Sequence, residues 1–62
     1  MKPGDIVRRK EYGWLAIVLN TFYKLGLGGY QAPYVIIMWD NGMLDTCGER
    51  HLEVVIRNND QQ

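Results

Sequence analysis

The feature that most constrains the fold is the stretch of residues 34–47, YVIIMWDNGMLDTC, in which Asn41-Gly42 separates two apolar segments. Asn-Gly in such a setting predicts a β-hairpin, because a two-residue type I′ turn needs a positive φ at both central residues. A two-residue loop also fixes which residues face one another across the two strands. The predicted pairs are Asp40 with Met43, Trp39 with Leu44, Met38 with Asp45, and Ile37 with Thr46.

This register assigns every side chain of the hairpin to one of two faces, because successive side chains of a strand point to opposite sides. One face would hold Val35, Ile37, Trp39 and Leu44, and the other Ile36, Met38, Asp45 and Cys47. The charge of Asp45 identifies the second face as the outer one. The predicted core is Val7, Val18, Val35, Ile37, Leu44, Leu52 and Val54, with Trp39 packed at one end.

Three further strands are predicted at residues 5–9 (DIVRR), 14–22 (WLAIVLNTF) and 53–57 (EVVIR). A buried helix is the alternative for residues 14–22, but the run follows Gly13 and carries Asn20-Thr21 near its end, which favours a strand. Residues 23–33 hold three glycines and are predicted to be a flexible connection. Their glycines do not form the phosphate-binding pattern GxxxxGK[ST]. Residues 48–52 are short enough for a single 3₁₀ turn.

The count of five short strands predicts an all-β, five-stranded small barrel with one short 3₁₀ turn, since closure removes exposed sheet edges. Residues 1–57 would form this one domain, and residues 58–62 a polar C-terminal tail that frays. A core of this size supplies only about 3–5 kcal/mol of stability. Association with a partner is therefore expected to add to it.

The amino-acid composition excludes several classes of site and of function. A single cysteine and a single histidine exclude an internal disulfide and a zinc site, and we expect no metal and no cofactor. A net charge of zero lacks the basic excess of a general nucleic-acid binder. Neither a signal peptide nor an apolar run long enough to span a membrane is found, and the lone thiol fits a reducing compartment. The expectation is a soluble cytoplasmic domain.

The order GDIVRR, GWLAIVLN, a variable loop, YVIIMWDNG and LEVV resembles SH3-like small barrels, and more closely the short SH3-like proteins of tailed bacteriophages, cyanophages among them. The matching positions are Gly4, Asp5, Val7, Arg8, Gly13, Trp14, Val18, Val35, Ile37, Trp39, Asp40, Gly42, Leu52, Glu53 and Val54. The resemblance spans nearly the whole chain. It implies an SH3-like barrel and, for a phage protein, the host cytoplasm as its location.

The plasmid-encoded trimethoprim-resistant dihydrofolate reductase is a second small SH3-like chain with a similar opening, and it acts as a tetramer around a central pore. Its Val-Gln-Ile-Tyr motif before the last strand has no counterpart here, where residues 43–47 read MLDTC. An oligomeric reductase is therefore only a remote alternative. Paired carboxylates at useful spacing are also absent from the sequence, so we expect no enzymatic activity.

Aromatic and basic residues are the candidates for a binding groove, because tyrosine and tryptophan give wide, rigid contact areas with a polar tip. The groove candidates are Arg8, Arg9, Tyr12, Trp14, Tyr30 and Tyr34. The alternative is that the aromatic residues cap the barrel ends and the basic ones form a solvated face. A nucleic-acid-associated barrel would use Arg8, Arg9, Lys10 and Arg57 with Tyr12 and Trp14.

A second candidate surface follows from apolar residues on both faces of the central strands. If Ala16 and Val18 face inward, then Leu15, Ile17 and Leu19 face outward, beside Ile36 and Met38 of the hairpin. The interface candidates are Ile17, Leu19, Ile36 and Met38, unless the glycine-rich loop or the tail folds over them. The sequence thus favours a non-enzymatic protein-binding or assembly module, whose partner is another protein or further copies of itself.

Overall fold

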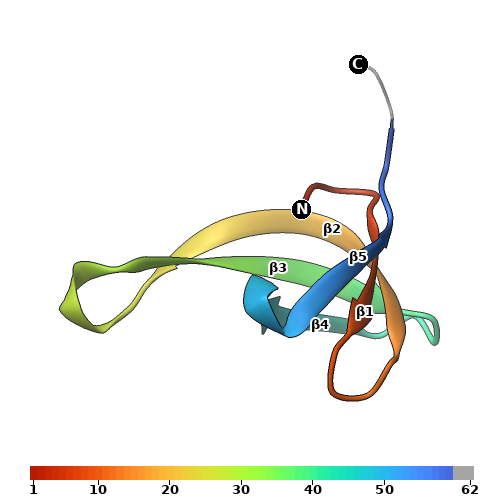
Figure 1. Cartoon of the computed structure of the whole chain (residues 1–62), viewed down its shortest axis with the longest axis horizontal. Helices are drawn as coiled ribbons and strands as arrows, with labels where there is room; N and C mark the ends of the chain where they lie inside the picture. The colour runs from red at the N-terminus through yellow and green to blue at the C-terminus, as the bar shows by residue number, and fades with distance from the viewer. Residues whose placement is uncertain (60–62) are drawn as a thin grey trace.

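Five antiparallel strands form one sheet in the computed structural model, which describes residues 1–59 (Figure 1). The strands are β1 (Ile6–Arg9), β2 (Leu15–Leu25), β3 (Gln31–Trp39), β4 (Leu44–Gly48) and β5 (Leu52–Ile56). Two 3₁₀ turns, η1 (Leu27–Gly29) and η2 (Glu49–His51), lie between them. The strand order is β4-β3-β2-β1-β5. The prediction of an all-β chain with five strands is confirmed.

The sheet does not close into a barrel by strand pairing over the described residues, since β4 and β5 are its two edges. It is strongly curved, and β2 follows the curve along its length (Figure 1). A register shift between Val18 and Asn20 leaves Leu19 as an extra residue in β2. Such a bulge bends and twists a strand, which accounts for part of the curvature.

The hairpin formed by β2 and β3 is longer than predicted. Residues 23–25 continue β2 and residues 31–33 begin β3, so the prediction of a flexible connection over residues 23–33 is wrong for both flanks. Only residues 26–30 turn the chain, and the Gly26 N–H donates to the Tyr30 carbonyl over 2.7 Å. The ladder continues from Phe22 opposite Tyr34 to Leu25 opposite Gln31, and these cross-strand contacts outweigh the local flexibility that glycine gives.

The turn between β3 and β4 has three residues instead of two. The Trp39 N–H donates to the Met43 carbonyl, and the Gly42 N–H donates to the Trp39 carbonyl, both over 2.9 Å. Gly42 has a φ of 86°, whereas no non-glycine residue of the described chain has a positive φ. The predicted type I′ turn is therefore wrong, and the loop is the three-residue type with a glycine in the left-handed region. The Asn41 Oδ1 accepts from the Met43 N–H over 3.0 Å and stabilises it.

The extra loop residue shifts the register of β4 by one position. Met38 faces Leu44, Ile37 faces Asp45, and Val35 faces Cys47. A shift by one exchanges the faces of a strand, so three assignments, those of Leu44, Asp45 and Cys47, are wrong. Asp45 opposes the core residue Ile37 and stays exposed only because β4 is an edge strand. Leu44 is 63% exposed and lies outside the core, whereas Cys47 is buried within it.

All five strands contribute to one hydrophobic core. Its buried members are Val7, Ala16, Val18, Val35, Ile37, Cys47 and Leu52, and half-buried Trp39 and Val54 pack against them. The predicted core is thus confirmed except for Leu44. Because β4 and β5 are opposite edges yet supply Cys47 and Leu52 to the same cluster, the sheet curls around a single concave face.

A buried carboxylate joins the two ends of the described chain. Asp5 is 1% exposed and accepts from the Lys2 N–H over 3.1 Å and from the Asn58 N–H over 2.7 Å. Burial acts to raise the pKa of Asp5, but these two backbone donors and the nearby positive charges lower it below its ordinary value. Asn58, the first residue of the predicted tail, is therefore anchored. Residues 60–62 of that tail lie outside the described residues.

Candidate functional site

Three exposed or half-buried rings gather beside the β1–β2 turn, and we call Tyr12, Trp14 and Trp39 the aromatic corner. The rings of Tyr12 and Trp14 stack with centroids 4.7 Å apart. Trp14 meets Trp39 edge to face at 5.8 Å, with an interplanar angle of 90°. This contact follows from the sheet register, because Trp39 pairs with Ala16 two residues after Trp14. Tyr12 and Trp14 are each more than half exposed, which leaves their outer faces open to a partner.

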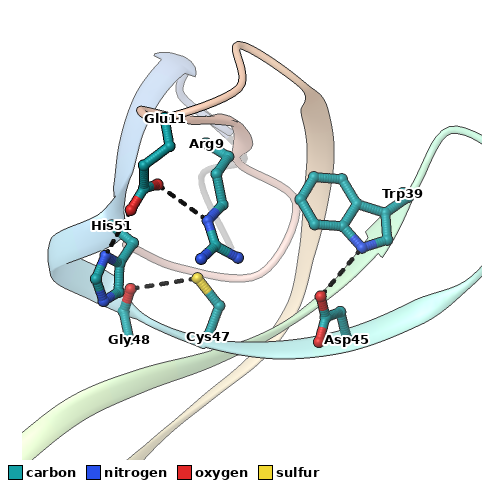
Figure 2. Close-up of polar contacts among 7 residues, drawn as sticks. All are labelled: Arg9, Glu11, Trp39, Asp45, Cys47, Gly48 and His51. Carbon is teal, nitrogen blue, oxygen red and sulfur yellow. Dashed lines mark hydrogen bonds and ion pairs between the residues drawn. The ribbon is translucent and has the colours of Figure 1, made fainter.

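A recess of 330 Å³ opens beside Trp14 and Trp39 and is completed by Leu15, Asp40 and Asn41. The Trp39 indole N–H donates to the Asp45 carboxylate over 3.3 Å, which holds the ring in place (Figure 2). Two perpendicular indole rings beside a carboxylate can receive an apolar or a cationic side chain. The sequence placed Trp39 at one end of the core but did not indicate that Asp40 lies beside the same recess.

A polar cluster lies near the aromatic corner, under the β1–β2 turn (Figure 2). The Arg9 Nε donates to Glu11 over 3.1 Å, and the His51 Nδ1 lies 3.2 Å from the second oxygen of that carboxylate. The hydrogen bond from Arg9 lowers the pKa of Glu11. Arg9 also lies over the Tyr12 ring, 5.4 Å from its centroid. The cluster thus positions the turn that carries Tyr12 and Trp14.

Cys47 points toward this cluster but is not activated by it (Figure 2). Its thiol contacts the Gly48 carbonyl over 3.4 Å and is buried in the core. Burial raises the pKa of Cys47, and the positive charge of Arg9 only partly opposes this effect. A thiol with a raised pKa is protonated at neutral pH and is a poor nucleophile.

The remaining groove candidates lie elsewhere on the molecule. Arg8 lies on the other face of the sheet, where its guanidinium binds Glu53 through contacts of 2.9 and 2.6 Å. Tyr30 follows η1 at the tip of the β2–β3 hairpin and is 78% exposed. Tyr34 stacks on Phe22 along that hairpin at 5.9 Å. The six candidates are thus distributed over three places, and only Arg9, Tyr12 and Trp14 come together.

Two of the four cationic residues considered for nucleic-acid binding are paired with carboxylates, whereas Lys10 and Arg57 line one recess beside Glu49 and Arg50. Arg8 is paired with Glu53, and Arg9 with Glu11. Paired guanidinium groups must give up a carboxylate before they can bind a phosphate, which lowers the gain from each contact.

A continuous apolar row crosses the outer face of the sheet. Its members are successive cross-strand partners, Ile56 with Ile6, Ile6 with Ile17, Ile17 with Met38, and Met38 with Leu44. We call these five residues the outer row. Side chains of directly opposed residues lie on the same face, so the row spans all five strands. Leu44 and Ile56 are both more than 60% exposed, and Ile6, Ile17 and Met38 are half-buried.

The predicted interface residues lie in or beside the outer row. Ile17 and Met38 are members of it, Ile36 lies two residues from Met38 on β3, and Leu19 is exposed at the bulge. A recess of 350 Å³ opens beside Ile6, Ile17 and Met38. The sequence did not indicate Ile6, Leu44 or Ile56, because their place in the row depends on pairings with β1 and β4. The alternation of apolar residues shows on which face of its own strand a residue lies, but not which residues of the neighbouring strands lie beside it.

No family model matches the chain, and neither a curated protein nor a solved structure matches it. Within residues 1–59, no group of three or more His, Cys, Asp or Glu side chains could hold a metal ion. The described part of the chain also has no helix with the length and apolarity needed to cross a membrane.

Proposed function

We propose that this chain is a non-enzymatic binding and assembly module that associates with protein, including copies of itself, through the outer row. The observation that carries this proposal is the uninterrupted row of five apolar partners across the exposed face of the sheet. A sheet face exposed to water normally alternates with polar residues at such positions. Contiguous apolar patches on a small domain usually mark an interface.

The gain from covering the outer row is large for so small a domain. Fully burying an aliphatic side chain of this size is worth roughly 1.5–3 kcal/mol. Leu44 and Ile56 alone still expose 63% and 61% of their surface. The ion pair of Arg8 and Glu53 lies on the same face, because these residues pair with each other and Arg8 pairs with Leu15. An exposed ion pair at this position can form the polar rim of an interface.

We propose further that the fold is an SH3-like small barrel of the type found in short phage proteins. Support comes from the strong curvature of β2 and from the single core to which both edge strands contribute (Figure 1). A binding role is consistent with that class, because small barrels host many functions and their exposed surfaces decide which. The reductase stays a remote alternative, because residues 43–47 read MLDTC and do not contain its motif.

Sedimentation velocity over a range of micromolar concentrations tests the proposal. The wild type is expected to associate, and Met38→Glu is expected to weaken this association because it places a charge within the outer row, between Ile17 and Leu44. Lys10→Gln is the matched control, since it changes the net charge by the same amount at an exposed residue of the β1–β2 turn. If Met38→Glu associates as strongly as Lys10→Gln, the outer row is not an interface.

A further inference from the structure

The outer half of the β2–β3 hairpin extends beyond the rest of the sheet. In Figure 1 it projects to the left, away from β1, β4 and β5. We call residues 21–34 the arm, whose last residue, Tyr34, still pairs with Gly48 of β4. On β2 no residue of the arm is buried, although its strand pairing continues to Leu25 opposite Gln31. A two-stranded ribbon alone in water is marginally stable, so the arm needs a cover that the described chain does not supply.

One face of the arm is covered by its own side chains. Phe22 stacks on Tyr34 with centroids 5.9 Å apart, and the Lys24 ammonium lies 5.3 Å from the centre of the Tyr34 ring. Phe22 pairs directly with Tyr34, and Lys24 is two residues further along the same face. The only charge of the arm therefore lies over an aromatic ring on this covered face.

The opposite face of the arm is open and mostly apolar, with Gln31 opposite Leu25 as a polar member. Tyr23 and Leu25 alternate with Phe22 and Lys24 along β2, so they lie on the opposite face. This is the face of Thr21, which opposes the core residue Val35. Tyr23 is 69% exposed and Leu25 is 68% exposed. At the tip, Leu27 is 96% exposed and Tyr30 is 78% exposed. The face that forms the core in the body of the sheet thus continues onto the arm, and no element within residues 1–59 covers it.

We propose that the open face of the arm packs against the same face of a second copy of this chain in a two-fold symmetric dimer. Tyr23, Leu25, Leu27 and Tyr30 would be the contact residues. This interface is separate from the outer row, which lies on the other face of the sheet.

The area and the charge of the open face both favour a second copy. With large side chains on the order of 200 Å² each, the exposed fractions of these four residues amount to about 600 Å². A standard interface buries about 800 Å² on each partner, so four side chains supply most of one. Residues 25–39 contain no charge. An uncharged patch meets its own copy without repulsion, whereas it has nothing to offer an anionic lipid or a polyanion.

The test compares a double change on the open face with a single change on the covered face by sedimentation velocity. Tyr23→Thr with Leu25→Thr removes the two strand residues of the open face, leaves Leu27 and Tyr30 in place, and keeps a good strand former at both positions. Lys24→Thr, on the covered face of the same strand, is the matched control. Circular dichroism of each variant verifies that the sheet is retained. We expect the double variant to lose the dimerisation that takes place through the arm, and the control Lys24→Thr to retain it.

Combination with Met38→Glu separates this inference from the proposed function. If both surfaces associate, each change alone leaves a dimer and the combined variant is a monomer. If the arm variant associates like the wild type, the arm inference is wrong while the outer row stands. If the arm variant alone is a monomer and Met38→Glu has no effect, the arm inference stands and the proposed function fails. Binding of the arm to neutral lipid vesicles with no dimer in solution would also overturn it.

Discussion

Replacing Asp5 with asparagine is expected to destabilise the fold out of proportion to the small change in shape. The two carboxylate oxygens of Asp5 each accept a backbone N–H, from Lys2 over 3.1 Å and from Asn58 over 2.7 Å. An asparagine offers one oxygen and one amino group, so one of the two N–H donors would face another donor. A hydrogen bond to a charged group contributes about 1.5–3 kcal/mol. Losing one such bond would remove a large part of a total stability of about 3–5 kcal/mol.

The pH dependence distinguishes this mechanism from a simple packing defect. The pKa of Asp5 is lowered in the folded state from its ordinary value of 3.8. A carboxyl group with a lowered pKa stabilises the fold fully above its unfolded pKa, and this contribution is lost as the pH falls through the folded pKa. The difference in unfolding free energy between wild type and Asp5→Asn should therefore be constant near neutral pH and shrink as the pH falls below about 4.

Urea unfolding followed by tryptophan fluorescence at a series of pH values measures this difference. Asp40→Asn serves as the control, because Asp40 is an exposed carboxylate at the β3–β4 loop. It should differ little from the wild type at neutral pH. Asp5 does not have this role if Asp5→Asn is as stable as Asp40→Asn, or if the loss of stability in Asp5→Asn persists unchanged in acid.

Two further predictions test the register and the first turn. Ile37→Ala should lower the free energy of unfolding by roughly 2–5 kcal/mol, because Ile37 is fully buried. Leu44→Ala should lower it by less than about 0.5 kcal/mol, because Leu44 is exposed. Both are measured by urea unfolding under dilute, monomeric conditions. A large loss of stability in Leu44→Ala would show that Leu44 is buried. That result would contradict the three-residue loop and support the two-residue turn. Gly4→Ala should destabilise more than Gly13→Ala in the same melts, since both have positive φ but only at Gly4 would a Cβ collide with the Asn58 side chain. Equal losses would show that Asn58 is not packed there.

The strands of the fold could be predicted from the sequence, but the length of one turn could not. Asn41-Gly42 suits a two-residue type I′ turn and equally a three-residue loop that ends in a left-handed glycine. The hydrogen bond from Met43 to the Asn41 side chain favours the second, and it is not encoded in any spacing. Alternation within β3 was predicted correctly, since Val35 and Ile37 are fully buried. On β4 the residues also alternate, but each was assigned to the wrong face because the register is shifted by one residue.

The surfaces were predictable only as far as they depend on a single strand. Ile17 and Met38 were identified from the alternation within their own strands, and they are cross-strand partners on the outer face. The aromatic corner could not be predicted from single strands, because the contact of Trp39 with Trp14 depends on the pairing of Trp39 with Ala16. The arm was missed for a different reason. The density of glycine near its tip suggested flexibility, although Tyr23 and Leu25 lie in paired strand.

The distribution of side-chain size between the core and the surface is the strongest general argument for association. The buried core is built from small and medium side chains, none of them aromatic. The large apolar residues lie outside it, with Trp14 59%, Tyr23 69% and Leu27 96% exposed. Folding of the single chain would gain most from burying the largest side chains, since the gain scales with the apolar area removed from water. Stability of one copy therefore does not account for these residues, and this is why we propose contact with a partner.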